Sequence, residues 1–237
     1  QPITTNAGVP MIGAFSGVEL LREPYKPLVM NVRATYYQET EAMVEHLTRD
    51  LGYTRIGIMY QDDAYGQAGL TGLQRALEKR NMTLAGEGTY ERNTSAIKSA
   101  LLAVRKARPE AVIMIASYKS AAEFIKLARE IKFNATFVNV SFVGSDSLAR
   151  ELGPAGAGVV VTQVVPFPFD TRIPVVARYQ KSLKDVAPSG QPGFVSLEGY
   201  LVGRTLIAGL EAIDGEPTRK GLIEAVQKAS PLDLGGL

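Results

Sequence analysis

The stretch Arg55–Gly69, RIGIMYQDDAYGQAG, decides the fold. Its apolar first part predicts a buried strand that ends in a polar loop. The loop leads into residues 70–79, where leucines recur at helical spacing. The same order returns at Ala111–Arg129, where the run AVIMIA is followed by a polar turn and a second helical pattern. Repeated strand–loop–helix units are typical of parallel strands joined by helical crossovers, so we expect an α/β fold.

Apolar periodicity and breaker residues predict the other elements along the chain. Strands are expected at 9–13, 83–90, 136–140 and 158–165, and helices at 37–51, 95–107, 121–131, 146–152, 174–186, 196–212 and 218–229. The run at 158–165 is mostly valine, which is typical of a buried parallel strand. The last residues, 232–237, are interpreted as the start of another strand.

These elements predict a division of the chain into two lobes. Residues 34–168 alternate strand and helix and form a self-sufficient layer system, with hinge strands at both ends. Residues 1–33 and 169–237 supply a short strand and three helices without a sheet to cover. We therefore expect them to be parts of one discontinuous and incomplete lobe. Pro166 and Pro168 mark the exit from the central lobe, because proline ends strand pairing.

Composition limits the classes of function. The 237 residues carry 26 basic and 24 acidic side chains without a block of like charge, which disfavours nucleic-acid binding. No apolar run reaches the roughly 18 residues of a membrane helix. The chain has no cysteine, so disulfides and thiolate chemistry are excluded. The first residues lack a signal-peptide pattern, so we expect either a mature form or a sequence whose beginning is missing.

Three patterns that resemble catalytic or cofactor sites have simpler explanations. Asp62 and Asp63 lie in a polar loop, where acidic residues commonly form turns. His46 is the only histidine and has no metal-ligating partner at suitable spacing. The glycine repeat at 66–72 is not the dinucleotide fingerprint. We therefore predict no enzymatic activity, no metal and no cofactor.

The order of strands and loops does predict a small-molecule site. In open parallel sheets, ligands bind outside the carboxyl ends of the strands. Tyr65 and Tyr118 follow two of the expected strands and fall at that edge. Other roles stay open, because Tyr65 could cap its own loop and Tyr118 could pack in the core. Lys119 could pair with an anionic ligand or remain a solvated surface lysine.

Several segments together resemble a known family. They are VPMIGAFSG at 9–17, the helix entry at 31–34, RIGIMYQDDAYGQAG, FVGSDSL at 142–148 and VVPFP at 164–168. These segments resemble the branched-chain amino-acid ABC-transporter binding proteins, which are type I periplasmic binding proteins similar to the leucine/isoleucine/valine-binding type. The resemblance implies two doubly wound parallel-sheet lobes joined by a hinge. It also implies that parts of the first lobe lie before Gln1 and after Leu237.

The resemblance implies a set of ligand-contacting residues. They are Phe15, Ser16, Gly17, Gln38, Tyr65, Ser117, Tyr118 and Ser141. The first three correspond to the loop that binds a ligand carboxylate, and a helix beginning at Gly17 would favour an anion there.

Two of these positions depart from the family pattern. Gln38 and Ser141 stand where amino-acid binders keep an aspartate and a glutamate for the ligand ammonium. Burying an ammonium group without a carboxylate is costly. We therefore expect a neutral or anionic acid, including an aromatic one, to fit at least as well as an amino acid.

The implied function is that of an extracytoplasmic solute-binding protein of an ABC importer. Its partners would be a small carboxylate-bearing ligand and the permease subunits in the membrane, with no nucleic acid. The expected location is the periplasm, or the cell exterior with a lipid anchor in a Gram-positive source. The alternative is a ligand-sensing domain of the same fold that signals to a protein partner.

Overall fold

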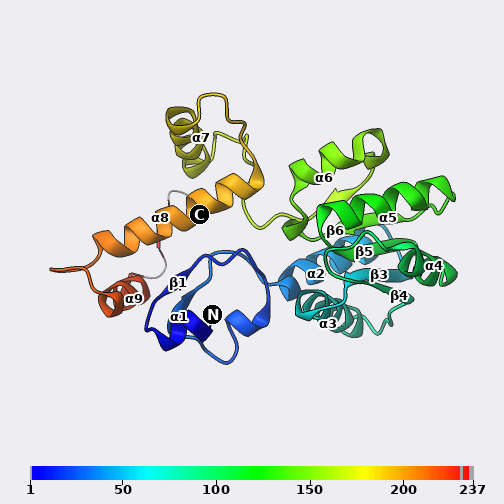
Figure 1. Ribbon diagram of the computed structural model, residues 1–237, viewed down its shortest axis with the longest axis horizontal. Helices are drawn as coiled ribbons and strands as arrows, with labels where there is room; N and C mark the ends of the chain where they lie inside the picture. The colour runs from blue at the N-terminus through cyan, green and yellow to red at the C-terminus, as the bar shows by residue number, and fades with distance from the viewer. Residues whose placement is uncertain (1, 230–231, 235–237) are drawn as a thin grey trace. The chain divides into compact units, whose positions relative to one another are not determined.

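A computed structural model describes residues 2–229 and 232–234 and divides the chain into two units (Figure 1). The continuous unit is Thr35–Gln163, and the discontinuous unit combines Gln1–Ala34 with Val164–Leu237. The limits expected from the sequence for the central lobe, 34 and 168, differ slightly from these.

The continuous unit contains a five-stranded parallel sheet. The strands lie in the order β4 (Gly86–Tyr90), β3 (Ile56–Gln61), β5 (Ala111–Ile115), β6 (Thr136–Asn139) and β7 (Val160–Val161). Every residue of β3 and β5 is buried, as expected for strands that are covered on both faces.

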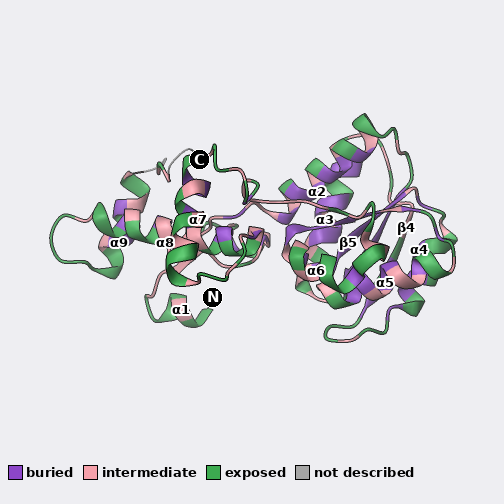
Figure 2. Ribbon diagram, turned by 90° about the horizontal axis from the view of Figure 1, so that it is seen from above, coloured by how far each residue is buried: buried purple, intermediate pink, exposed green. Residues whose placement is uncertain are grey.

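Helices cover both faces of this sheet. They are α2 (Tyr36–Glu45), α3 (Ala64–Glu78), α4 (Lys98–Lys106), α5 (Tyr118–Glu130) and α6 (Ser145–Leu152). The buried faces of α4, α5 and α6 share one apolar cluster with Met59, Val112 and Met114 from the strands. Alternate strand residues point to opposite faces, so Ile115 lies on the other face, where α3 packs against it. Figure 2 shows the buried strands between exposed helix surfaces.

The glycine repeat at 66–72 serves this packing. A β-carbon on Gly66 would lie 1.8 Å from the carbonyl oxygen of Gln61, and one on Gly69 would lie 2.4 Å from the side chain of Ile115. Glycine is therefore required for the close approach of α3 to the sheet, and the repeat has a structural explanation.

The predicted strand at 158–165 was wrong in length and burial. Only Val160–Val161 pair, and Val160 is 37% exposed. The reason is that β7 lies at the edge of the sheet and pairs only with β6. A valine run therefore indicated β-structure correctly but could not distinguish an edge strand from a central one.

The discontinuous unit has a smaller sheet. Its strands β1 (Met11–Ile12) and β2 (Val29–Met30) pair in parallel, and its helices are α1 (Pro2–Asn6), α7 (Pro174–Val186), α8 (Phe194–Glu211) and α9 (Arg219–Lys228). Strand β2 was not expected from the sequence. The strand expected at 232–237 is not formed by Leu232–Leu234, and its last residues lie outside the described part of the chain.

Candidate ligand-binding site

The carboxyl edge of the five-stranded sheet contains a topological switch point. From β3 the chain passes to β4 on one side, and it then returns to form β5 on the other side of β3. Crossovers therefore diverge between β3 and β5, which is the place where open α/β sheets bind ligands. Tyr65 follows β3, and Ser117 and Tyr118 follow β5, so all three predicted residues flank this point.

The start of α3 positions Tyr65. Asp63 is the N-cap, and its carboxylate accepts the backbone N–H groups of Tyr65 at 3.0 Å and Gly66 at 3.2 Å. This contact explains the acidic loop as a helix cap. The Tyr65 hydroxyl donates to the carbonyl oxygen of Ala116 at 3.5 Å, so this side chain reaches from the β3 loop to the end of β5.

Aromatic rings surround Tyr65 at this edge. Its ring centroid lies 5.3 Å from that of Tyr36 and 4.7 Å from that of Phe142. Aromatic pairs at these separations attract one another and limit ring motion. Tyr36 is fully buried, whereas Tyr65 and Phe142 are partly exposed and give the edge an apolar aromatic surface, which suits the apolar part of a small ligand.

A polar network lies beside the aromatic cluster. The Tyr90 hydroxyl donates to Gln61 Oε1 at 3.2 Å and accepts the backbone N–H of Ser117 at 3.1 Å. Burial raises the pKa of the Tyr90 phenol, so this group remains a hydrogen-bond donor. Ser117 Oγ is hydrogen-bonded to Ser120 Oγ at 3.1 Å. Tyr118 is half-buried and packs against the apolar core.

Gln38 caps α2 on the exposed side of the helix. Its Oε1 accepts the backbone N–H of Thr35 at 2.8 Å, and Thr35 Oγ1 accepts the N–H of Gln38 at 3.0 Å. This reciprocal capping box holds the Gln38 side chain against the start of the helix. The Thr35-x-x-Gln38 spacing is the sequence signature of such a cap, and it was not used in the prediction.

Glu39 is the residue that sequence reasoning missed. Its side chain lies at the carboxyl edge of β6 and β7, and only 4% of the residue is exposed. The carboxylate accepts Ser141 N–H at 2.8 Å, Ser141 Oγ at 3.0 Å and Thr162 Oγ1 at 2.5 Å. The Glu39 carboxylate therefore contacts Ser141. The sequence had suggested that this position offers no negative charge to a ligand ammonium group.

In the discontinuous unit, the loop Phe15-Ser16-Gly17 differs from the expectation. No helix begins at Gly17. The first helical element after it is a three-residue 3-10 turn that starts at Glu19. Ser16 Oγ accepts the N–H of Val18 at 3.4 Å. So short a turn has no appreciable dipole, and the predicted helix-dipole contribution to anion binding was wrong.

Arg33 organises the surroundings of that loop. Its guanidinium carbon lies 4.4 Å from the centroid of the Phe15 ring, and its Nε lies 3.1 Å from Glu198 Oε1 of α8. The side chains of Arg33 and Glu198 are 1% and 7% exposed. This buried ion pair joins the N-terminal segment to α8 within the same unit.

Other site classes find little support in the described residues. Residues 2–229 and 232–234 contain no group of three or more acidic or histidine side chains arranged to hold a metal ion. None of the helices in this part of the chain combines the length and apolarity needed to span a membrane.

Comparison with family models decides the classification. Residues 1–236 match the model described as "Periplasmic binding protein". The chain belongs to the periplasmic binding protein family. This family consists of solute-binding proteins rather than enzymes, as the sequence predicted. The parallel α/β architecture is the fold of these proteins.

Solved structures of the family resemble this chain closely. A "possible leucine/isoleucine/valine-binding protein" from Rhodopirellula baltica is 38% identical, with a TM-score of 0.90 over 96% of this chain and 63% of that one. A substrate-binding periplasmic protein from Ralstonia solanacearum is 26% identical, with a TM-score of 0.90 over 99% of this chain and 66% of that one. The chain thus spans about two thirds of their length. A search of curated proteins found no match.

A third structure shows the same fold at lower identity. It is the solute-binding protein of an R. palustris ABC transporter in complex with benzoate, 20% identical, with a TM-score of 0.79 over 95% of this chain and 62% of that one.

Proposed function

We propose that this chain is part of an extracytoplasmic solute-binding protein that binds a small carboxylate-bearing ligand and delivers it to an ABC permease. The match of residues 1–236 to the periplasmic binding protein model is the observation that carries this proposal. Transport rather than sensing is favoured because the R. palustris protein of the same fold belongs to an ABC transporter. The comparisons give no support to the lipid-anchored alternative.

Within this proposal, the carboxyl edge of the continuous unit supplies contacts to the ligand. Tyr65, Ser117 and Tyr118 lie at the switch point, and the rings around Tyr65 suit an apolar group. Phe15, Ser16 and Gly17 of the discontinuous unit remain proposed contacts to the carboxylate. Gln38 is the weakest of the eight candidates, because its amide oxygen already caps α2.

Glu39 bears on the class of ligand. Its buried carboxylate receives three hydrogen bonds, and no lysine or arginine in the described residues lies within ion-pairing distance of it. A buried carboxylate is stabilised by a cation. An amino acid is therefore as suitable a ligand as a simple acid. The expectation about simple acids rested on the absence of a carboxylate for the ligand ammonium, and Glu39 supplies a carboxylate at Ser141. The R. baltica protein is named for aliphatic amino acids and the R. palustris protein holds benzoate, so both classes deserve testing.

The test begins with native mass spectrometry of the purified full-length protein, which identifies a retained ligand. Calorimetry with that ligand then compares Tyr65→Ala with Tyr53→Ala, a tyrosine that hydrogen-bonds Thr136 at the opposite edge of the sheet. We expect Tyr65→Ala to weaken binding at least about tenfold and Tyr53→Ala to leave it unchanged. Equal affinities for the two variants would remove Tyr65 from the site.

A second pair of variants separates the ligand classes. With an ammonium-bearing ligand, Glu39→Gln should weaken binding about tenfold or more, because the neutral amide cannot compensate the ligand charge. Thr162→Val removes one donor to Glu39 but keeps the carboxylate, so it should change affinity far less. Unchanged affinity of Glu39→Gln would show that the ligand carries no ammonium group at this position.

A further inference from the structure

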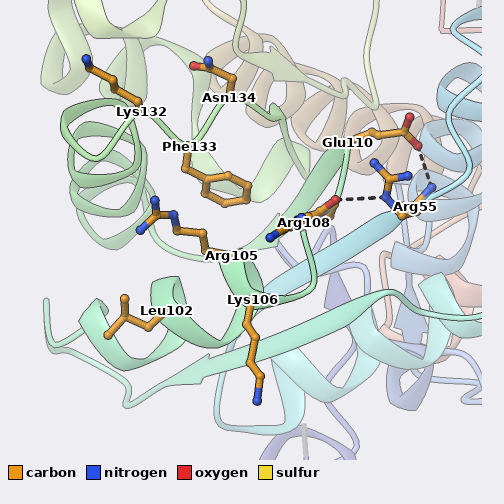
Figure 3. A pocket seen from close by; sticks show the side chains of 10 residues that line it. Arg55, Leu102, Arg105, Lys106, Arg108, Glu110, Lys132, Phe133 and Asn134 are labelled. Atoms are coloured by element: carbon orange, nitrogen blue, oxygen red, sulfur yellow. Dashed lines mark hydrogen bonds between the residues drawn. The ribbon is translucent and has the colours of Figure 1, made fainter.

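A groove with a volume of about 600 Å³ lies at the amino edge of the sheet in the continuous unit, opposite to the carboxyl edge described above (Figure 3). Arg55 precedes β3, Glu110 precedes β5, and Phe133 precedes β6. The C-terminal part of α4, including Leu102, forms one wall. The groove is therefore formed by the segments that precede β3, β5 and β6 and by the C-terminal part of α4.

The groove is strongly cationic. Its lining includes five exposed basic side chains and one carboxylate: Arg55, Arg105, Lys106, Arg108 and Lys132, with Glu110. Among the described residues, no carboxylate lies within ion-pairing distance of any of the five cations. The resulting positive potential is available to an external anion.

Glu110 does not neutralise these cations by direct pairing. Its Oε2 accepts the backbone N–H groups of Thr54 at 2.8 Å and Arg55 at 2.9 Å, as Figure 3 shows for Arg55. The Arg55 Nε donates to the carbonyl oxygen of Arg108 at 3.1 Å. The Glu110 side chain thus holds the backbone in place just before β3. The Arg55 guanidinium is held at the groove by a neutral acceptor, the carbonyl oxygen of Arg108.

Stabilisation of α4 explains only some of the basic side chains that line the groove. Arg105 and Lys106 lie in the last turn of α4, where cations interact favourably with the helix dipole. That effect does not account for Arg55, which precedes β3, or for Leu102, which is 60% exposed beside the cations. Arginine is enriched at protein interfaces, and Leu102 adds exposed apolar surface among these cations.

We propose that this groove binds an acidic segment of a partner protein. Its concave shape suits protruding acidic side chains better than a flat lipid surface. All five cations are exposed, whereas a small-molecule site would bury most of its ligand among apolar side chains. Leu102, which is exposed, offers a contact for an aliphatic side chain between the acidic ones. The inference does not depend on the ligand of the carboxyl edge.

The test measures binding of a synthetic peptide of alternating glutamate and leucine by fluorescence anisotropy. The groove variant carries Arg105→Gln, Lys106→Gln and Lys132→Gln, since glutamine is compatible with helix ends. A matched control removes the same charge elsewhere, by Lys98→Gln, Arg150→Gln and Lys184→Gln. We expect the groove variant to bind about tenfold more weakly, the control to change less than about twofold, and added salt to abolish the difference.

Three outcomes would contradict the proposed binding of an acidic protein segment. Equal losses in the two triple variants would show unspecific attraction. Groove-dependent binding of phosphatidylglycerol vesicles or of inorganic polyphosphate, without binding of the peptide, would assign the groove to another kind of anion. Sedimentation that shows a dimer of this chain, dissociated by the groove variant, would assign it to self-association. As a positive check, Leu102→Ala should weaken peptide binding, and this loss should persist at high salt.

Discussion

The continuous and discontinuous units differ in how they bury apolar surface. In the continuous unit, helices cover both faces of a five-stranded sheet, and strands such as β3 and β5 are fully buried. In the discontinuous unit, the described sheet has only two short strands, and α8 exposes Leu206, Ile207 and Leu210. The comparison indicates that the more extensively covered layer system lies within Thr35–Gln163, and we expect this unit to be the more stable of the two.

The largest expected effect is a difference in local stability between the two units. Amides of β3 and β5 should exchange with solvent at least about a thousandfold more slowly than those of β1 and β2, a difference of about 4 kcal/mol. Hydrogen exchange of this chain, followed by mass spectrometry, measures this ratio directly. Equal protection in the two sheets would contradict the comparison.

A pair of core substitutions sharpens the same contrast. Phe137 is fully buried, and its ring lies 6.1 Å from that of Phe124. Phe137→Ala should destabilise the continuous unit by about 3–5 kcal/mol, because it removes apolar contacts and leaves a cavity. Leu206→Ala in α8, where the residue is 36% exposed, should cost less than about 1 kcal/mol. Urea denaturation of the two variants checks this order, and a larger effect of Leu206→Ala would reverse it.

One buried contact should matter in the discontinuous unit. Glu198→Gln removes the carboxylate that pairs with the buried Arg33 side chain and should cost about 3 kcal/mol. The exposed pair Lys220–Glu224 provides the control, and Glu224→Gln should cost less than about 0.5 kcal/mol. Thermal unfolding compares the two variants. If their melting temperatures agree, the buried pair does not stabilise this unit.

The smallest expected effect concerns Glu110 at the amino edge of the continuous unit. Hydrogen bonds from the backbone N–H groups of Thr54 and Arg55 hold the pKa of this carboxyl below its usual value. The ionised form is therefore favoured in the folded state, so its contribution to stability is present above the unfolded pKa. This contribution is lost as the pH falls through the lower folded pKa. NMR titration should show the depressed pKa, and Glu110→Gln should flatten this part of the acid dependence. An ordinary pKa for Glu110 would contradict the account.

The central strands could be predicted because full burial leaves a clear sequence pattern. The runs IGIMY and AVIMI are apolar throughout, as parallel strands covered on both faces must be. Their order along the chain also indicated which loops lie at the carboxyl edge, and so pointed to Tyr65 and Tyr118. Strand β2 was missed because Val29–Met30 is too short to show a period.

The details of the site could be predicted less well. Gln38 and Glu39 are neighbours in α2, and composition does not reveal which of them faces the sheet. The capping signature from Thr35 would have assigned Gln38 to the helix start and left Glu39 as the inward carboxylate. The contact between Glu39 and Ser141 joins residues far apart in the chain, so only the folded structure reveals it.

The central claim is that the carboxyl edge of the continuous unit contacts a ligand that the protein leaves chemically unchanged. The most direct measurement is an NMR titration of the isotopically labelled full-length protein with the ligand identified by native mass spectrometry. We predict that the largest shifts occur at Tyr65, Ser117 and Ser141 and that the ligand is recovered intact. Shifts confined to other parts of the continuous unit, or conversion of the ligand to a product, would contradict the account.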